Sequence, residues 1–469
     1  MSIKNLFEND LKVVNTGLSS FKESLDKTNT KSVQVDWRPG VDVDPELVEV
    51  LKLHADKINA ANELALGKIL SGTPHLVGLG IAIDVIPGMK KNLILHAGPP
   101  VKWENMCGPT RGAIMGGLIY EGIANSIEEA EKIASSGEIE YAPCHEHSSV
   151  GPMAGVITPS MPVFIIENKA HGNFAYCTMN EGLGKVLRYG AYGEDVIKKL
   201  KWMEKVLYPT LKKAVAAAGS INLKNLIAQA LHMGDEVHNR NRAGTSLFYR
   251  AIAPHVIRTA DSADTAADVM EFINGNDHFF LNLSMPAAKA TLDAARNIEF
   301  SSVCTVMARN GTEFGVQLSG TGGTWFTGVA PVPDALYFPG YTKDDANPDI
   351  GDSAITETVG LGGFAIASSP AIVQFVGGTA KDAVGYTLKM YEISAGENNI
   401  YQIPYLNFRG TPTGIDVRKV IEKNVTPFID TGVAHKNPGV GQVGAGVLSA
   451  PMEPFKNAWI GLANLLKNQ

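Results

Sequence analysis

Hydrophobic and polar positions alternate between a strand-like and a helical periodicity along the first hundred residues. Strand-like apolar runs occupy residues 12–15, 32–36 and 75–83, and apolar residues recur at helical spacing between them, above all over 45–70. Strands that alternate with helices are typical of a parallel sheet covered by helices. The pattern therefore predicts a doubly wound α/β domain over residues 1–100.

The rhythm changes after residue 100. Strand-like runs near residues 141 and 163 predict a mixed α/β domain over 101–194, and the long helical repeats that follow predict a helical subdomain over 195–298. Strand-like runs then return on both sides of Asn310-Gly311, a dipeptide that favours a tight hairpin because it tolerates positive φ. We expect a strand-rich α/β domain over 299–469, and a multidomain α/β fold for the whole chain.

The composition of the chain excludes some classes of partner but does not indicate a function. Hydrophobic residues make up 45% of the 469 residues, which is enough material for several cores. The net charge of −7 provides no basic face, so a nucleic-acid partner is not expected. Two long uncharged stretches, 314–333 and 358–380, are broken by small polar residues and proline, and we expect no membrane helix there. Four dispersed cysteines are typical of reduced thiols in a cytoplasmic protein.

Unusual local chemistry gathers between residues 96 and 112. A strand-like run ends at His96, and a turn through Cys107 and Gly108 then opens a helix of small residues. Thr110 and Arg111 lie in the first turn of that helix. Free N–H groups, a hydroxyl and a guanidinium at one helix start favour the binding of phosphate or a carboxylate. The alternative is a structural junction whose arginine pairs with an acidic residue.

A second candidate is the Cys144-His145-Glu146-His147 segment. Side chains at alternate positions of a strand point the same way, so His145 and His147 with Cys144 could hold a transition metal. They could equally form a polar pocket wall in which His145 or His147 donates to an anionic substrate, or be structural histidines. All three interpretations stay open.

Two further segments place arginine beside small polar residues. Asn239, Arg240 and Arg242 lie in a loop between predicted helices, and Arg409 and Thr411 precede another helix. Guanidinium groups can grip a carboxylate or phosphate with two parallel hydrogen bonds. The first segment is equally consistent with a solvated loop that pairs with neighbouring acidic residues.

Several blocks of the chain resemble the YlbE-like family. These blocks are 33–39, Asp84-Val85-Ile86-Pro87-Gly88-Met89, His96-Ala97-Gly98-Pro99-Pro100, Cys107-Gly108-Pro109 and Asn239-Arg240-Asn241. The resemblance runs over essentially the whole chain. It implies a subunit of an oxamate carbamoyltransferase that works beside an FdrA-like partner resembling succinyl-CoA synthetase. The implied reaction converts oxalurate and phosphate into oxamate and carbamoyl phosphate in allantoin and purine catabolism.

That chemistry needs a phosphate cradle, a group that polarises the carbonyl oxygen, and a grip on a carboxylate. We expect His96, Arg111 and His145 to be catalytic and to converge on one cleft. The expected substrate-binding residues are Gly98, Cys107, Gly108, Thr110, His147, Asn239, Arg240, Arg242, Arg409 and Thr411. No cofactor and no metal is expected. The expected partners are small anionic substrates (phosphate or carbamoyl phosphate and an oxamate-like acid), the FdrA-like subunit, and further copies in a homo- or hetero-oligomer.

Two other functions remain open at this point. The chain could be a non-catalytic subunit that shapes the site of an FdrA-like partner. It could also be a metal-dependent hydrolase built on Cys144, His145 and His147.

Overall fold

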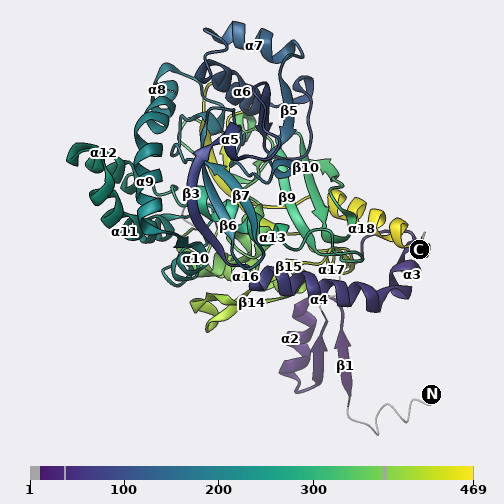
Figure 1. Cartoon of the computed structure of the whole chain (residues 1–469). Coiled ribbons are helices and arrows are strands. Elements are labelled where there is room, and N and C mark those ends of the chain that lie inside the picture. The colour runs from purple at the N-terminus through teal and green to yellow at the C-terminus, as the bar shows by residue number, and fades with distance from the viewer. Residues whose placement is uncertain (1–10, 36–38, 373–377, 468–469) are drawn as a thin grey trace.

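The computed structural model describes residues 11–35, 39–372 and 378–467. It is a mixed α/β structure in which the described strands form six small sheets (Figure 1). The α/β fold class is confirmed. The domain boundaries near residues 100, 194 and 298 stay a prediction.

The N-terminal part begins with a small unit that projects from the body below α4 (Figure 1). Its strands β1 (Lys12–Asn15) and β2 (Lys31–Gln34) pair in parallel around helix α2 (Ser19–Lys27). Two helices, α3 (Pro45–Leu53) and α4 (Ala55–Ser71), then lead to β3 (Pro74–Ile81). The side chain of Asp44 accepts the Glu46 N–H and caps α3, with proline in the first turn, where it costs no hydrogen bond.

The sheet that contains β3 differs from the predicted one. Strand β3 lies between β6 (Pro162–Asn168) and β8 (Ile221–Asn222), and β7 (Asn173–Thr178) lies beside β6. All three pairings are antiparallel. Among the described residues of the first hundred, parallel pairing is confined to β1–β2 and to β4 with a later strand. Strand–helix alternation specifies the elements but not the pairing partner, and here the partners of β3 come from far along the chain.

The middle part carries the junction that matters for function. Strand β4 (Leu93–His96) pairs in parallel with β5 (Glu140–Pro143), and the register sets His96 opposite Pro143. A single 3-10 turn, Cys144–His147, follows β5 directly. The helices of this part are α5 (Ala82–Val85), α6 (Gly108–Tyr120) and α7 (Ile127–Ser135). Because the strands run in parallel, both carboxyl ends open at the same place.

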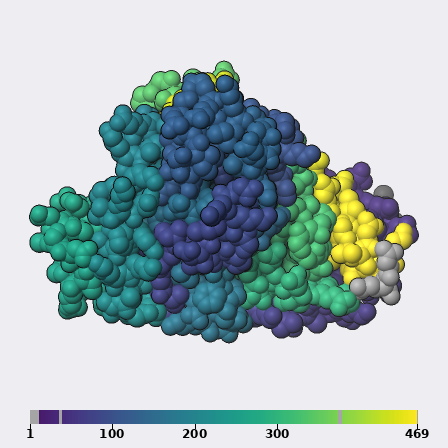
Figure 2. Space-filling model, turned by 45° about the horizontal axis from the view of Figure 1, so that its top comes forward, coloured from purple at the N-terminus to yellow at the C-terminus, as the bar shows by residue number. Residues whose placement is uncertain are grey.

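The predicted helical segment is helical. It contains α8 (Glu194–Trp202), a π-helical turn (Met203–Leu207), α9 (Tyr208–Ala218), α10 (Leu223–His232), α11 (Arg242–Thr259), α12 (Ala263–Asn274) and α13 (Leu281–Asp293). Figure 2 shows α8–α12 in teal as one flank of the molecule, opposite the yellow α18 (Met452–Lys467). Helix α13 is different, because every residue from Leu281 to Leu292 is buried. It packs against β6 and β7 and forms the centre of the largest hydrophobic core.

The C-terminal part is rich in strands, as predicted. One antiparallel sheet has the order β11 (Phe326–Val329), β10 (Glu313–Leu318), β9 (Cys304–Asn310) and β13 (Ile350–Gly351). The predicted hairpin is confirmed, since Gly311 turns between β9 and β10 with φ +84°. The remaining elements are β12 (Ala335–Tyr337), α14 (Ile355–Val359), α16 (Ala380–Ile393), β14 (Ser394–Ile403), β15 (Arg409–Ile415), α17 (Val417–Lys423), β16 (Phe428–Ala434) and β17 (Gln442–Ser449). No described helix is both long enough and apolar enough to cross a membrane.

Candidate functional site

His96 ends strand β4 as a buried histidine with one unused ring nitrogen. Its Nδ1 donates to the carbonyl oxygen of Ala97 at 2.9 Å, and its Nε2 is buried without a hydrogen-bond partner. Since a carbonyl only accepts, the proton sits on Nδ1 and Nε2 keeps its lone pair. Burial lowers the pKa of His96 to about 4. The ring is therefore a neutral proton acceptor at physiological pH.

His145 lies in the 3-10 turn that continues from the neighbouring strand β5. Both ring nitrogens are buried without a hydrogen bond, and Nε2 lies 3.5 Å from Oδ1 of Asp352. The edge of the Trp325 ring system meets the imidazole, with centroids 6.1 Å apart. Burial, and then the positive charges of Lys289 and Arg296, hold the pKa of His145 well below its usual range. This imidazole too is neutral.

Asp352 connects the two histidine segments. Its carboxylate accepts the Gly98 N–H at 2.8 Å and the Gly151 N–H at 3.0 Å. Burial raises the pKa of Asp352 to about 7, although those two N–H groups and the nearby Arg309 and Lys289 oppose the rise. Gly98 has φ +84°, and a Cβ there would lie 2.3 Å from the Asn310 nitrogen, so only glycine fits. We call His96, His145 and Asp352 the histidine cluster, because Asp352 lies beside the His145 ring and accepts the N–H of Gly98, two residues after His96.

A cationic edge borders the histidine cluster. Lys289 is fully buried on α13 and donates to the His145 carbonyl at 3.2 Å and to Asp293 at 2.7 Å. Asp293 also lies 3.7 Å from the Arg296 guanidinium. Both Asp293 and Arg296 line a hollow of about 330 Å³ that includes Pro87, whose carbonyl oxygen is 2.7 Å from Nδ1 of His147. An anion in this hollow would therefore lie beside Arg296.

The start of α6 is more closed than its sequence suggests. The Arg111 guanidinium donates to the carbonyl oxygens of Trp103 at 3.1 Å and Glu104 at 2.8 Å. A Cβ on Gly108 would lie 2.0 Å from the Lys436 carbonyl oxygen, so another segment covers the first turn. Cys107 Sγ and Thr110 Oγ1 lie 3.3 Å apart. These contacts close a turn onto the helix, and none of them involves the histidine cluster.

The arginines predicted to bind a carboxylate lie in two separate places. Arg240 and Arg242, with Asn239, line a hollow of about 490 Å³, and Arg242 lies 3.7 Å from Asp277. Arg409 lies on the β14–β15 hairpin, where it donates twice to one oxygen of Glu397, at 2.6 and 3.0 Å. Thr411 is buried on the same hairpin, and its hydroxyl has no hydrogen-bond partner. The hairpin contacts do not connect Arg409 to the histidine cluster.

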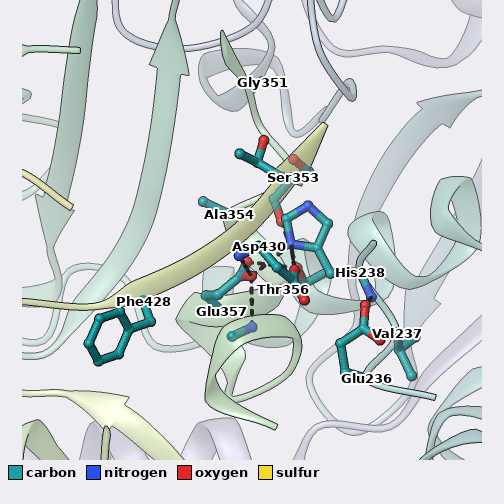
Figure 3. A network of polar contacts seen from close by, with 12 residues as sticks. Glu236, Val237, His238, Gly351, Ser353, Ala354, Thr356, Glu357, Phe428 and Asp430 are labelled. Carbon is teal, nitrogen blue, oxygen red and sulfur yellow. Dashed lines mark hydrogen bonds and ion pairs between the residues drawn. The ribbon is translucent and has the colours of Figure 1, made fainter. Parts of the chain in front are cut away.

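A third group of side chains was not predicted. His238, Glu357 and Asp430 are buried together, as Figure 3 shows, and we call them the acidic cluster. The Nδ1 atom of His238 lies 2.7 Å from Glu357 Oε1 and 3.0 Å from Asp430 Oδ1. Burial lowers the pKa of His238, but the two carboxylates outweigh it and raise the pKa to about 10. Burial also raises the pKa of Asp430 to about 6 against the pull of His238.

The residues from 349 to 357 run between the two clusters. Asp352 belongs to the histidine cluster and Glu357 to the acidic cluster. Arg309, which is fully buried, braces this segment through Asp349 (2.5 and 3.1 Å) and the Gly351 carbonyl oxygen (2.7 Å). Its charge acts on both Asp352 and Glu357. The two clusters are therefore joined by one short segment of the chain, which Arg309 holds in place.

Sequence reasoning missed these charged partners, although a signal exists for them. Lys289, Glu357 and Asp430 each stand alone in an otherwise uncharged apolar run. Such a run is buried, and a charge buried with it needs a partner or a function. An isolated charge in an apolar run is thus the pattern that would have marked them.

The metal site considered for Cys144, His145 and His147 is not formed. Cys144 donates to the Gly155 carbonyl at 3.2 Å, and burial raises the pKa of its thiol well above the ordinary value, against thiolate formation. Within residues 11–35, 39–372 and 378–467, the one group of three or more ligand-bearing side chains close enough to share an ion is His238, Glu357 and Asp430. The hydrolase interpretation loses its structural basis.

Comparison with known proteins finds one matching family, and two relatives that match most of the chain. The model of the family described as oxamate carbamoyltransferase subunit AllG matches residues 139–353. The chain is 46% identical over 463 residues to the uncharacterized protein YahG of Escherichia coli (strain K12), covering 98% of both chains. It is 43% identical over 406 residues to the oxamate carbamoyltransferase subunit AllG of Escherichia coli (strain K12), covering 86% of this chain and 97% of AllG.

A solved structure is also similar. It is the crystal structure of a conserved protein of unknown function from Enterococcus faecalis V583, with 48% sequence identity and a TM-score of 0.86, covering 88% of this chain and 99% of that one. The resemblance drawn from the sequence blocks is confirmed at this level. On these identities and this coverage, the chain belongs to the family of the oxamate carbamoyltransferase subunit AllG.

Proposed function

We propose that this chain is a subunit of a carbamoyltransferase that interconverts oxalurate plus phosphate with oxamate plus carbamoyl phosphate. The observation that carries the proposal is the pair of buried, neutral imidazoles at the joined ends of β4 and β5, in a chain 43% identical to an oxamate carbamoyltransferase subunit. In purine and allantoin catabolism this reaction would follow the formation of oxalurate. The site would lie in the cytoplasm.

The chemistry requires a proton to be moved. A phosphate oxygen bonds to the carbamoyl carbon of oxalurate, the bond from that carbon to the amide nitrogen breaks, and the nitrogen leaves as the amide of oxamate with one added proton. His96 Nε2 has the free lone pair to accept the phosphate proton. Asp352, whose pKa burial raises to about 7, can supply the proton for the leaving nitrogen, and His145 beside it is the candidate relay: one ring nitrogen accepts a proton as the other donates one, so the imidazole stays neutral.

Both substrates are anions, so the site needs cationic neighbours. Arg296 lines the hollow of about 330 Å³ together with Asp293, and the buried Lys289, which donates to the His145 carbonyl, shares the same Asp293 carboxylate, so the two cations outnumber the one anion. We assign one anion to this hollow, with the Arg240 hollow as the second candidate. Arg111 is assigned a structural role, because its guanidinium is bound to two carbonyl oxygens.

Partner subunits belong to the proposal. The relative from Escherichia coli is described as a subunit, and we infer that this chain also works in a complex, with an FdrA-like protein as the expected partner. A non-catalytic role for this chain within the same complex is the competing function. It predicts that the histidine cluster can be altered without loss of turnover.

The test is a phosphate-dependent assay with ¹³C-labelled oxalurate. The chain is purified alone and together with the proteins encoded beside its gene, and carbamoyl phosphate is followed by ¹³C NMR. We expect carbamoyl phosphate and oxamate to appear in equal amounts with the assembled complex, and none without phosphate. An assembled complex that leaves oxalurate intact would overturn the proposed reaction. Parallel samples with other carbamoylated acids define the substrate.

A further inference from the structure

We propose that His238, Glu357 and Asp430 bind a divalent transition-metal ion. The three residues come from three separate segments: the loop before α11, helix α14 and strand β16. Each offers one ligand atom, and these atoms all lie within 4.8 Å of one another (Figure 3). The proposal does not depend on carbamoyl transfer, because it concerns residues outside the histidine cluster.

The spacing of the ligand atoms matches a shared ion. Nδ1 of His238 is 2.7 Å from Glu357 Oε1 and 3.0 Å from Asp430 Oδ1. Imidazole nitrogen and carboxylate oxygen each bind zinc at about 2.0–2.2 Å, so two such ligands at right angles lie about 3 Å apart. The same distances also fit an ion pair of a protonated imidazole, and a further observation is needed to choose between them.

The unpartnered carboxylate oxygens supply that observation. Asp430 is fully buried, and apart from the approach of His238 Nδ1 to its Oδ1 at 3.0 Å, neither of its carboxylate oxygens has a hydrogen-bond partner. The Oε2 atom of Glu236, two residues before His238, is also buried without a hydrogen bond. Buried polar atoms are almost always satisfied, and a buried carboxylate without donors is costly. A cation held by His238, Glu357 and Asp430 would satisfy the Asp430 oxygens.

The charge balance points the same way. Four buried carboxyl groups belong to this region: Glu357 and Asp430 contact the His238 ring, and Asp235 and Glu236 precede His238 in the chain. Backbone N–H groups serve Asp235 and one oxygen of Glu236, because Gly244 donates to the first and Arg240 to the second. Those groups do not reach Asp430, whose carboxylate has only the His238 ring beside it as a donor. A divalent ion would neutralise the excess negative charge where it is greatest.

Glu357 is already held in the orientation of a ligand. Oε1 accepts the Gly363 N–H at 3.0 Å, and Oε2 accepts the Thr356 hydroxyl at 3.0 Å. Gly362 has φ +55°, and a Cβ there would lie 2.1 Å from Oε1 of Glu357, so glycine lets the loop close over the carboxylate. Hydrogen bonds of this kind orient the ligands of metal sites.

The ligand types select the class of ion. One imidazole nitrogen with carboxylate oxygens and no thiolate suits Zn²⁺, Mn²⁺ or Fe²⁺, whereas Ca²⁺ and Mg²⁺ prefer oxygen alone. Asn239, next to His238, lines the hollow of about 490 Å³ together with His278, so this hollow lies one residue along the chain from a proposed ligand. The ion would tie the loop before α11 to α14 and β16.

The test compares metal binding by full-length variants. The protein is stripped with a chelator, and Mn²⁺ and Zn²⁺ are titrated separately by calorimetry. We expect one ion per chain, and an affinity at least roughly 100-fold weaker in Asp430→Asn, because even outer-shell changes cost 10–100-fold. His435→Ala is the matched control, since it removes a histidine 3.9 Å from Asp345 and should keep the affinity.

The outcomes separate the metal site from an ion pair. No binding of either ion, or equal affinity in wild type and Asp430→Asn, would establish the ion pair and overturn the proposal. Should Asp430→Asn fail to fold, crystals of the wild-type protein soaked in Mn²⁺ decide the matter by anomalous diffraction. A peak bonded to His238 Nδ1 supports the site, and its absence there overturns it. Neither result bears on whether oxalurate is turned over.

Discussion

Histidine protonation is the central feature at the residue scale. His96 and His145 are both buried, and their lowered pKa values keep the imidazoles neutral at physiological pH, with a ring nitrogen free to accept a proton. The acidic cluster shows the opposite balance, because two carboxylates surround His238 and raise its pKa. Burial alone therefore does not set the state of a histidine. The number of carboxylates in contact with the ring decides it.

The depressed pKa of His96 predicts a pH dependence of stability. Its folded pKa of about 4 lies below the ordinary value of 6.5, so the unfolded chain binds more protons between these pH values. The contribution is fully present above pH 6.5 and is lost as the pH falls toward 4, by about 3 kcal/mol in total. Wild type should lose more stability than His96→Asn across this window, as measured by thermal unfolding midpoints. Parallel curves for the two proteins would contradict it, and the exposed His232→Asn serves as control.

Single residues also mark how far sequence reasoning reaches. The sequence predicts one cleft shared by His96, Arg111, His145 and an arginine from residues 239–242 or Arg409. The parallel pairing of β4 and β5 sets the strand ends next to His96 and His145 side by side, whereas Arg111 and Arg409 make their contacts elsewhere. Asp352 was missed because its contacts with Gly98 and Gly151 join positions more than 200 residues apart. Such contacts depend on tertiary pairing, which no local pattern encodes.

At the element scale, the start of α6 shows how a motif acquires a structural role. A proline-containing helix start with threonine and arginine is chemically suited to an anion. Here Arg111 instead bonds the carbonyl oxygens of Trp103 and Glu104 and lies over the Trp103 ring, 5.2 Å from its centroid. The helix itself was predicted correctly. The direction of the arginine depends on the 3-10 turn Trp103–Asn105, which has no strong sequence signal.

We therefore predict a structural effect for Arg111→Ala. Loss of two charge-assisted hydrogen bonds and the ring contact should destabilise the protein by about 2 kcal/mol. Turnover of the assembled complex should stay within a few fold of wild type. Chemical denaturation and steady-state rates measure the two effects. A stable Arg111→Ala protein with turnover reduced 100-fold would instead return Arg111 to the catalytic residues.

At the scale of the whole molecule, a segment of nine residues joins two buried clusters. Arg309 braces residues 349–357, with Asp352 facing the histidines and Glu357 facing the acidic cluster. The sequence predicted the α/β class and the helical and strand-rich parts. It could not predict that β3 pairs with β6 and β8. A strand has the same apolar pattern whether its neighbours run parallel or antiparallel to it.

The projecting N-terminal unit provides a prediction about assembly. Its helix α2 has no buried residue, and Leu18 and Phe21 are 70% and 59% exposed. Large exposed apolar side chains on one small unit are typical of an interaction surface. If the chain is a subunit, Leu18→Glu with Phe21→Glu should weaken binding to the partner at least tenfold by calorimetry. The same pair of changes at Leu53 and Leu64, also exposed, is the control, and equal weakening by both pairs would count against this surface.

The most direct test of the account replaces the imidazole of His145 in the reconstituted complex. Gln keeps hydrogen-bonding capacity but cannot carry a proton at neutral pH, and the loss of a general acid or base costs roughly 100-fold or more. We predict that His145→Gln lowers kcat for carbamoyl phosphate formation by at least that factor, while the complex assembles with unchanged affinity. Full turnover by an assembled His145→Gln complex would contradict the account and place the chemistry in another subunit.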